Sequence, residues 1–560
     1  MDIEKRMFLA IAVCILIWIA FSPKAVKKAD KPGAKVVAEQ SQVDNSAEGQ
    51  ERKSSGEQGN KEPSERGNKA EETGTQNLET RIIEEVSVKE SLQTLENDLF
   101  KISVLNKEGL IKSIKLKNYK SQINKSSSSV EMVGFDSSQY YMPFWNIQLA
   151  GDDEVLKLTY DFEKSEKNEI ILKSLPNPYF IVSKKYKVDE NSYVIETSMD
   201  IENISESNIN FSTIIKIPQN IPEDEKTSGF LSFATRPNMQ VGMVDILGKV
   251  QRETLSSMKE NESKNFDGSF IWAGLGDKYF ANLVLPLKTE LKSTVFSKES
   301  KDLALFKATH ANKKLEPGEK TQIAFRLFSG PLEIDVLQNT EKELGKAIDL
   351  GNWLGPIARP MLKLMKFIHN YIPNYGIAII ILTILVKLLL FPLNQKQYKS
   401  MKAMQLLQPK IAELKEKFKD NKEKLNMETM NLFKQHKVNP MGGCLPMLFQ
   451  FPIFIALYRV LYNSIELRHA PFMGWIKDLS APDPLYISPV IMGITMFLQQ
   501  QMTPTTTMDP AQAKMMKIIP LVFALFMIML PSGLVIYIFI NSLLSILQQW
   551  LITRKKDVKI

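Results

Sequence analysis

Apolar residues are concentrated near the two ends of this chain, and a long polar region separates them. The first apolar run covers residues 7–21, and the remaining runs follow residue 350. Long apolar runs are typical of helices that cross a membrane, whereas short alternating runs are typical of strands. The pattern predicts a polytopic α-helical membrane protein, with six spans and a five-helix core, that carries a large exported antiparallel β-sandwich domain.

The first apolar run is assigned to an N-terminal anchor, residues 1–23. A cleaved signal peptide is the alternative, since fifteen apolar residues fit that length. Cleavage after Ala20 would place Trp18 where a small residue is needed, and bulky Val13 disfavours lipidation at Cys14. We therefore expect the anchor to stay uncleaved.

Residues 24–80 contain mostly Lys, Glu, Gly, Ser, Gln and Asn. Such a segment cannot bury enough apolar surface to offset its ordering entropy. We predict a disordered tether that leads to the exported domain.

Residues 81–345 change to short runs with apolar residues near period two, separated by turn-forming residues, which predicts the sandwich. The clearest runs are LFKISVLN, GLIKSIKLKNY, VLKLTYDFE, EIILKSL, YVIETSMDIEN and INFSTIIKIP. His310 is the sole histidine of this region, and its acidic residues are scattered, so no catalytic or metal-ligating cluster is indicated. A binding role for carbohydrate or protein stays open.

Residues 350–372 repeat apolar side chains at three- and four-residue spacing, with basic residues on another face. The apolar set is Leu354, Ile357, Met361, Leu364, Met365 and Ile368, and the basic set is Arg359, Lys363 and Lys366. This pattern predicts an amphipathic helix in the membrane interface, with a buried soluble helix as the alternative.

Five further apolar segments follow, within an expected five-span core at 374–554. They cover 375–393, 442–463, 485–502, 516–530 and 532–552. One helix through the last two would be more than about 50 Å long, which exceeds a bilayer core. Pro531, Ser532 and Gly533 therefore predict a tight hairpin between them.

Positive charge orients these segments. Residues 394–439 contain eleven lysines against five acidic residues, and the tail 555–560 is basic. Cytoplasmic loops carry such an excess of lysine and arginine. We expect both termini in the cytoplasm and the sandwich on the opposite side of the membrane.

The lysine-rich region 394–440 has two apolar stripes of its own, which predict a cytoplasmic helical hairpin. The first stripe is Ile411, Leu414 and Phe418, and the second is Leu425, Met430 and Phe433. A solvated connector is one interpretation. Contact with anionic lipid headgroups or ribosomal RNA is the other, because basic surfaces bind both.

Lys387 stands inside the otherwise uncharged run GIAIIILTILVKLLLFPLN. A charge at this depth costs roughly 3 kcal/mol or more unless it snorkels, pairs or faces water. Snorkelling is an alternative, because the expected helix exit near Asn394 is about 10 Å away. Polar residues at similar depth favour a wet groove instead; they are Thr383, Gln499, Gln500, Gln501, Tyr537, Asn541, Ser542 and Ser545.

The helical region resembles the YidC/Oxa/Albino family of membrane protein insertases, over residues 350–554 in unbroken order. The segments that carry the resemblance are LVKLLLFPLNQKQYKSMKAMQLLQPKI, NPMGGCLPMLFQFPIFIALYRVLYNSIELRHAPF, WIKDLSAPDP, MTPTTTMDPAQAKMMKIIP and PSGLVIYIFINSLLSILQQ. The anchor, tether and sandwich match the layout of the Gram-negative type, which implies a bacterial inner membrane with the sandwich in the periplasm.

The resemblance implies an insertase and folding chaperone for nascent inner-membrane proteins, acting alone or with the Sec translocon. It implies a client-binding groove with its positive charge at Lys387, bordered by Thr383, Gln500, Tyr537 and Asn541. The ribosome, through the cytoplasmic loops that include hairpin residues 408–437, and anionic lipid headgroups are the further expected partners. No P-loop is present, and neither a cofactor nor an enzymatic reaction is expected.

One position departs from the family, which usually carries arginine where this chain has Lys387. Lysine is a point charge that cannot bind a carboxylate in a bidentate manner. Two rival functions remain: a transporter or channel that uses Lys387 as an ion site, and an envelope binding protein whose sandwich does the work. A transporter would favour an internal repeat, which we do not find in the sequence.

Overall fold

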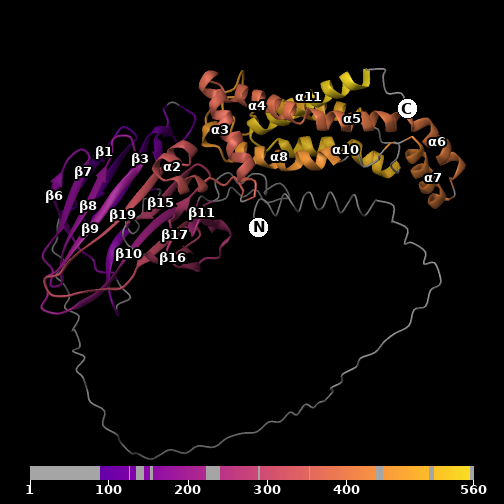
Figure 1. Cartoon of the computed structure of the whole chain (residues 1–560). Helices are drawn as coiled ribbons and strands as arrows, with labels where there is room; N and C mark the ends of the chain where they lie inside the picture. The colour runs from indigo at the N-terminus through magenta and orange to yellow at the C-terminus, as the bar shows by residue number, and fades with distance from the viewer. Residues whose placement is uncertain are drawn as a thin grey trace, which may run out of the picture. The chain divides into compact units, whose positions relative to one another are not determined.

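The computed structural model describes residues 89–554, apart from 125, 134–143, 152–154, 222–239, 288–290, 352, 420, 437, 439–444 and 503–509. The expected anchor 1–23, tether 24–80 and tail 555–560 lie outside the described residues. Within the described part, strands occupy the chain up to Pro331 and helices follow (Figure 1).

The strands form three sheets in which every recorded pairing is antiparallel, as predicted. The four-stranded sheet has the order β1 (Leu92–Glu96), β2 (Phe100–Leu105), β3 (Leu110–Lys120), β4 (Ser129–Glu131). The six-stranded sheet has the order β13 (Glu262–Asp267), β16 (Leu291–Lys298), β17 (Leu303–His310), β10 (Ile209–Asn220), β18 (Lys313–Leu315), with β5 (Phe144–Leu149) also paired to β10.

The third sheet has nine strands. Its order is β12 (Lys249–Thr254), β11 (Val241–Ile246), β14 (Trp272–Gly276), β15 (Phe280–Pro286), β19 (Lys320–Pro331), β9 (Val194–Asn203), β8 (Phe180–Val188), β7 (Glu169–Ser174), β6 (Tyr160–Ser165). These neighbours lie side by side in Figure 1.

Alternation along the strands explains why they form layers. In β8 every second side chain from Phe180 to Val188 is buried, and the intervening ones are half-buried. Successive side chains of a strand point to opposite faces, so one face meets the core. Aromatic rings fill that core, with the Trp145 and Phe325 centroids 4.7 Å apart in an edge-on arrangement.

The run VLKLTYDFE pairs over a shorter length than its alternation suggests. The ladder of β6 with β7 begins at Tyr160, opposite Ser174. Before it, Val155 makes only an isolated bridge to Gln148. Residues 156–159 face no continuous neighbouring strand, and therefore form no ladder despite their apolar pattern.

Ten α-helices follow the sandwich strands in the described chain. They are α2 (Ile334–Thr340), α3 (Gly355–Tyr371), α4 (Tyr375–Leu389), α5 (Phe391–Leu406), α6 (Gln408–Lys417), α7 (Lys422–Gln435), α8 (Leu445–Asn463), α9 (Ile487–Gln501), α10 (Pro510–Met527) and α11 (Ser532–Arg554), of which α2 is a short helix next to the last strand.

The expected amphipathic helix at 350–372 corresponds to α3, and it divides its apolar side chains between two environments. Met361, Met365 and Ile368 are buried, whereas Ile357 and Leu364 are exposed. The buried set contacts α4 and α8, which pack against α3.

The segment 375–393 is broken, contrary to the continuous helix expected there. Helix α4 ends at Leu389, and α5 begins at Phe391 after a bend of 66°. Pro392 explains the break, because its ring lacks an N–H donor and would clash with the carbonyl of Leu388 in a continuous helix. Lys387 consequently lies in the last turn of its helix.

Among the described residues, one helix is long and apolar enough to cross a membrane. It is α11, over Ser532–Ile552. The bent pair α4 and α5 passes the same test when its two helices are taken together. Helix α10 ends at Met527 and α11 begins at Ser532, so a break lies where the Pro-Ser-Gly sequence predicts a hairpin.

The lysine-rich region contains helices where a helical hairpin was predicted. Helices α6 and α7 contact each other, and Leu407, Ile411 and Phe433 form a small core of their own. Met430, expected in an apolar stripe, is 47 % exposed instead.

Candidate functional site

Lys387 occupies the last turn of α4, and its side chain is only 8 % exposed. A cation near a helix C-terminus interacts favourably with the helix dipole, by about 0.3–1 kcal/mol at an exposed site. That gain is small beside the cost of removing an ammonium group from water. The hydrogen-bond partners of Lys387 are therefore decisive.

Two neutral oxygens of α11 accept hydrogen bonds from the lysine. Nζ donates to Oγ of Ser545 at 2.7 Å and to Oδ1 of Asn541 at 3.3 Å. Ser545 also donates its hydroxyl proton to the carbonyl of Asn541 at 2.7 Å, which orients the oxygen toward Lys387. No ion pair of Lys387 with a carboxylate is recorded among the described residues, so its charge is solvated there by neutral groups alone.

Asn541 joins a third helix to this arrangement. Gln450 of α8 donates from Nε2 to Oδ1 of Asn541 at 3.4 Å. Helices α4, α8 and α11 therefore meet at one polar centre, which we call the lysine centre: Lys387, Asn541, Ser545 and Gln450.

Thr383 lies one turn before Lys387 and is 1 % exposed. Its hydroxyl donates to the carbonyl of Ile379 in its own helix at 2.6 Å. It therefore shares a helix face with Lys387, as four-residue spacing predicts. No hydrogen bond between the two side chains is recorded.

Tyr537 lies one turn before Asn541 on α11 and is 2 % exposed. Its ring is tilted against Phe454 of α8, with 6.0 Å between centroids. Tyr537 thus packs between helices on the same face of α11 as the lysine centre.

Gln500 is separate from the lysine centre in its contacts. It lies near the end of α9, is half-buried, and its Nε2 has no hydrogen-bond partner among the described residues. Helix α9 packs against α11, where Gln549 donates to the carbonyl of Met502 at 2.7 Å. The structure thus joins Lys387 and Asn541 directly. Thr383 and Tyr537 are neighbours on the contributing helices α4 and α11, whereas Gln500 lies on α9.

Sequence reasoning left two members of the lysine centre outside the predicted site. Ser545 had a signal, because it follows Tyr537 and Asn541 at four-residue spacing on one helix face. Gln450 had a weaker signal, a polar residue within the apolar run of α8. Neither signal specifies the partner, which depends on how the helices pack.

Unpaired polar atoms continue from the lysine centre toward α5. Asn394 is 2 % exposed and its Nδ2 has no partner among the described residues. Gln548 donates to the carbonyl of Phe391 at 3.4 Å, while its Oε1 has no partner there. Buried amides are normally satisfied, by water where protein groups are lacking.

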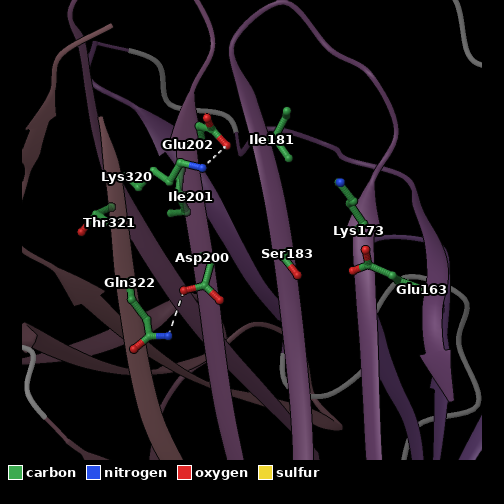
Figure 2. Close-up of a pocket in the computed structure, with 10 residues that line it drawn as sticks. All are labelled: Glu163, Lys173, Ile181, Ser183, Asp200, Ile201, Glu202, Lys320, Thr321 and Gln322. Atoms are coloured by element: carbon green, nitrogen blue, oxygen red, sulfur yellow. Dashed lines mark hydrogen bonds and ion pairs between the residues drawn. The ribbon is translucent and has the colours of Figure 1, made fainter. Parts of the chain in front are cut away.

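The sandwich contains a hollow of about 470 Å³ on the strands β6 to β9 and β19 (Figure 2). Two polar pairs lie within it: Lys320 with Glu202 at 3.1 Å, and Gln322 with Asp200 at 2.8 Å. Glu163 and Lys173 also line it, and no aromatic side chain is among its lining residues. The hollow is a polar surface of the sheet and does not resemble a built sugar or substrate site.

Comparisons with known proteins agree with the division into strands and helices. A family model described as the YidC periplasmic domain matches residues 92–364, and one described as 60Kd inner membrane protein matches residues 367–559. These matches define the class: an inner-membrane protein with a helical region and a periplasmic β-sandwich.

Similar proteins narrow this class to one family. The membrane protein insertase YidC of Geotalea daltonii is 40 % identical over 467 residues, which are 81 % of this chain and 85 % of that protein. The YidC of Syntrophus aciditrophicus is 39 % identical over 479 residues, 83 % of this chain and 86 % of that protein. A crystal structure of an active YidC insertase has 18 % identity and a TM-score of 0.37, and covers 83 % of this chain and 95 % of that one.

The chain belongs to the YidC family of membrane protein insertases. The resemblance seen in its sequence is thereby confirmed, together with the antiparallel periplasmic sandwich. Insertases of this family are not enzymes, and neither is this chain.

Proposed function

We propose that this chain inserts nascent proteins into the inner membrane and assists their folding, through a hydrophilic groove whose positive charge is Lys387. The observation that carries the proposal is the lysine centre. A buried ammonium group held by Ser545 and Asn541 keeps its charge available, because neither acceptor neutralises it. A hydrophilic client segment with acidic residues would be attracted to that charge.

The groove lowers the barrier to insertion in two ways. Polar groups such as Gln500, Asn394 and Gln548, each with an unpaired buried atom, favour water within the bundle. Water there shortens the apolar distance that a hydrophilic segment must cross. The charge of Lys387 adds local attraction without a covalent step or a nucleotide.

The membrane arrangement belongs to the same proposal. The N-terminal anchor and α4, α8, α9, α10 and α11 make six spans, with both termini in the cytoplasm and α3 in the interface. Hydrophobic client helices leave along α8 and α10, while the lysine-rich hairpin α6–α7 receives clients at the ribosome or at anionic headgroups. The Sec translocon is a partner for part of the clients.

Photocrosslinking tests the client path. A photoreactive residue at Thr383 or Lys387 should crosslink to the acidic N-terminal segment of a stalled nascent chain. The same residue at Ile384 or Leu388 is the matched control, since these neighbours are 38 % and 61 % exposed. Crosslinks at the control positions without crosslinks at 383 and 387 would place the client path outside the groove.

A further inference from the structure

The loop between α8 and α9, residues 464–486, exposes large apolar side chains. Met473 is 66 % exposed, Trp475 39 %, Leu485 57 % and Tyr486 53 %. We call these four residues the loop tip. Contiguous exposed apolar groups on a protein mark a surface that contacts something other than water.

Hydrogen bonds within the loop and to α4 order the segment that carries the loop tip. A turn is closed by the Ile476 amide donating to the Met473 carbonyl at 3.2 Å, and the Phe472 amide donates to the Ile476 carbonyl at 3.1 Å. Asn374, the cap of α4, donates from Nδ2 to the Phe472 carbonyl at 2.9 Å. These bonds join the loop to the first turn of α4.

Close packing at Gly376 also holds the loop against α4. A Cβ atom at this position would lie 2.0 Å from Cδ2 of Phe472, so the Phe472 ring lies directly on the helix backbone. The other end of the loop contacts α11, where the amides of Ser532 and Gly533 donate to the carbonyls of Ala481 and Leu479. The loop tip therefore has a fixed position at the ends of these helices.

Asp483 is the internal anchor of the loop tip. It is fully buried and accepts hydrogen bonds from Trp475 Nε1 at 3.0 Å, the Leu485 amide at 2.9 Å and the Ser488 hydroxyl at 2.6 Å. Burial acts to raise the pKa of Asp483, but these bonds outweigh it and the pKa is lowered, so the group is anionic. Trp475 thus turns its polar N–H inward and presents an apolar ring outward.

The exposed apolar surface continues from the loop tip onto α9, which begins directly after Tyr486. The exposed side chains of this helix are Val490, Ile491, Ile494, Phe497 and Leu498. Lys477 is the one exposed charged residue between 464 and 486. The surface thus combines aliphatic groups, the three aromatic rings of Trp475, Tyr486 and Phe497, and the single positive charge of Lys477.

We propose that the loop tip is seated in the outer leaflet of the membrane. Trp475 and Tyr486 would lie at headgroup level, where amphipathic rings are enriched. Met473 and Leu485 would contact acyl chains, and Lys477 would face lipid phosphates. Continuity with the apolar face of α9 favours lipid over a protein partner. The proposal rests on the proposed topology, which places this loop on the periplasmic side, and not on the groove.

Spin-label accessibility in the full-length chain tests whether the loop tip lies in the membrane. With Cys14 and Cys444 replaced by serine, single labels are placed at Met473 and Leu485, and the protein is reconstituted into phosphatidylcholine–phosphatidylglycerol vesicles. Oxygen partitions into lipid and a nickel chelate stays in water, so oxygen should be the stronger relaxant at both positions. A label at Leu247, a 90 % exposed leucine of the sandwich, is the control and should favour nickel.

Two results would overturn the proposal. Stronger relaxation by nickel at 473 and 485 would place the loop tip in water. Immobile labels that neither reagent reaches would show that a protein covers it, either a second copy or another chain. The variant Asp483→Ala adds an independent measure. Release of Trp475 should raise the mobility of the label at 473 and lower its oxygen accessibility. No change at 473 would show that Asp483 is not needed to hold the loop tip.

Discussion

At the residue scale, Lys387 combines a fixed position with an unneutralised charge. Its partners Ser545 and Asn541 supply oxygen lone pairs but no negative charge. Lysine attracts a carboxylate as a point charge, whereas arginine adds a rigid bidentate geometry. The proposed mechanism therefore depends on the sign of the charge at position 387 and not on the shape of the group.

Charge variants at 387 test this dependence. Lys387→Arg should preserve insertion of clients with acidic N-termini. Lys387→Glu should reduce it by at least about tenfold, because a change of about 1.4 kcal/mol already has that effect. Insertion into proteoliposomes by the purified chain is the measurement.

The matched control is the same client with its acidic N-terminal residues replaced by their amides. Its insertion should respond far less to Lys387→Glu, since no carboxylate is repelled. Equal insertion of the acidic client by the wild type and Lys387→Glu would disprove the electrostatic mechanism.

Lys184 in β8 is a second buried lysine, and its role is structural. It is 1 % exposed, and its Nζ donates to the Glu108 carbonyl at 2.5 Å and lies 4.8 Å from the Tyr160 ring centroid. Burial lowers the pKa of Lys184 to about 7, with a smaller opposing effect from the charge of Glu108. In the sequence, nothing distinguishes Lys184 from the other lysines of the alternating strands.

This lowered pKa makes the stability of the sandwich depend on pH. Between pH 7 and about 10.4 the unfolded chain binds a proton at Lys184 that the folded domain lacks. The free energy of unfolding should therefore rise with pH in this window, by up to about 1.4 kcal/mol per unit. The variant Lys184→Met should lose this slope.

Thermal unfolding of the sandwich within the solubilised chain, followed at several pH values, measures the slope. Lys185→Met is the control, because Lys185 is an exposed neighbour paired with Glu169. A wild-type slope no steeper than that of Lys184→Met would show that the buried amine keeps its proton.

At the element scale, the hydrophobic pattern predicted which segments are helices, but it did not predict where each helix ends. The run 375–393 reads as one span, although Pro392 divides it, because an apolar pattern continues through a break. The helical face of Tyr537, Asn541 and Ser545 was visible in the sequence. Its contact with Lys387 was not, since residues 154 or more positions apart meet only through the fold.

The hairpin α6–α7 is stabilised by a small core, and this makes it sensitive to one substitution. Phe433 is 4 % exposed and packs with Leu407 and Ile411. Phe433→Ala should destabilise the helical pair by about 3 kcal/mol, the low end for a buried phenylalanine, because the core is small. Faster hydrogen exchange of the α6 and α7 amides is the expected result.

Met427→Ala serves as the control, since Met427 is 55 % exposed on the same helix. Unchanged exchange in α6 after Phe433→Ala would mean that the two helices are stable without their shared core. If the hairpin receives clients, Phe433→Ala should also reduce recruitment of nascent chains before it affects their passage through the groove.

At the scale of the whole molecule, two separate family models cover the chain: residues 92–364, which include all the described strands together with α2 and part of α3, and residues 367–559, which include α4 to α11. The chemistry proposed for insertion lies entirely in the second part: Lys387, Asn541, Ser545 and Gln450 come from α4, α8 and α11. The hollow on the sandwich lies on the strands, outside the helical part, and contains the pairs Lys320 with Glu202 and Gln322 with Asp200. Insertion should accordingly depend on the helical part.

Deletion of residues 81–330 tests this division. The shortened chain should insert clients at a level close to that of the intact chain, because the lysine centre and its helices remain. Proteoliposome insertion measures it, and Lys387→Glu within the shortened chain is the control, since it should abolish the preference for acidic clients there too. Loss of insertion by a shortened chain that still folds and enters the membrane would instead assign the essential work to the sandwich, as an envelope binding protein requires.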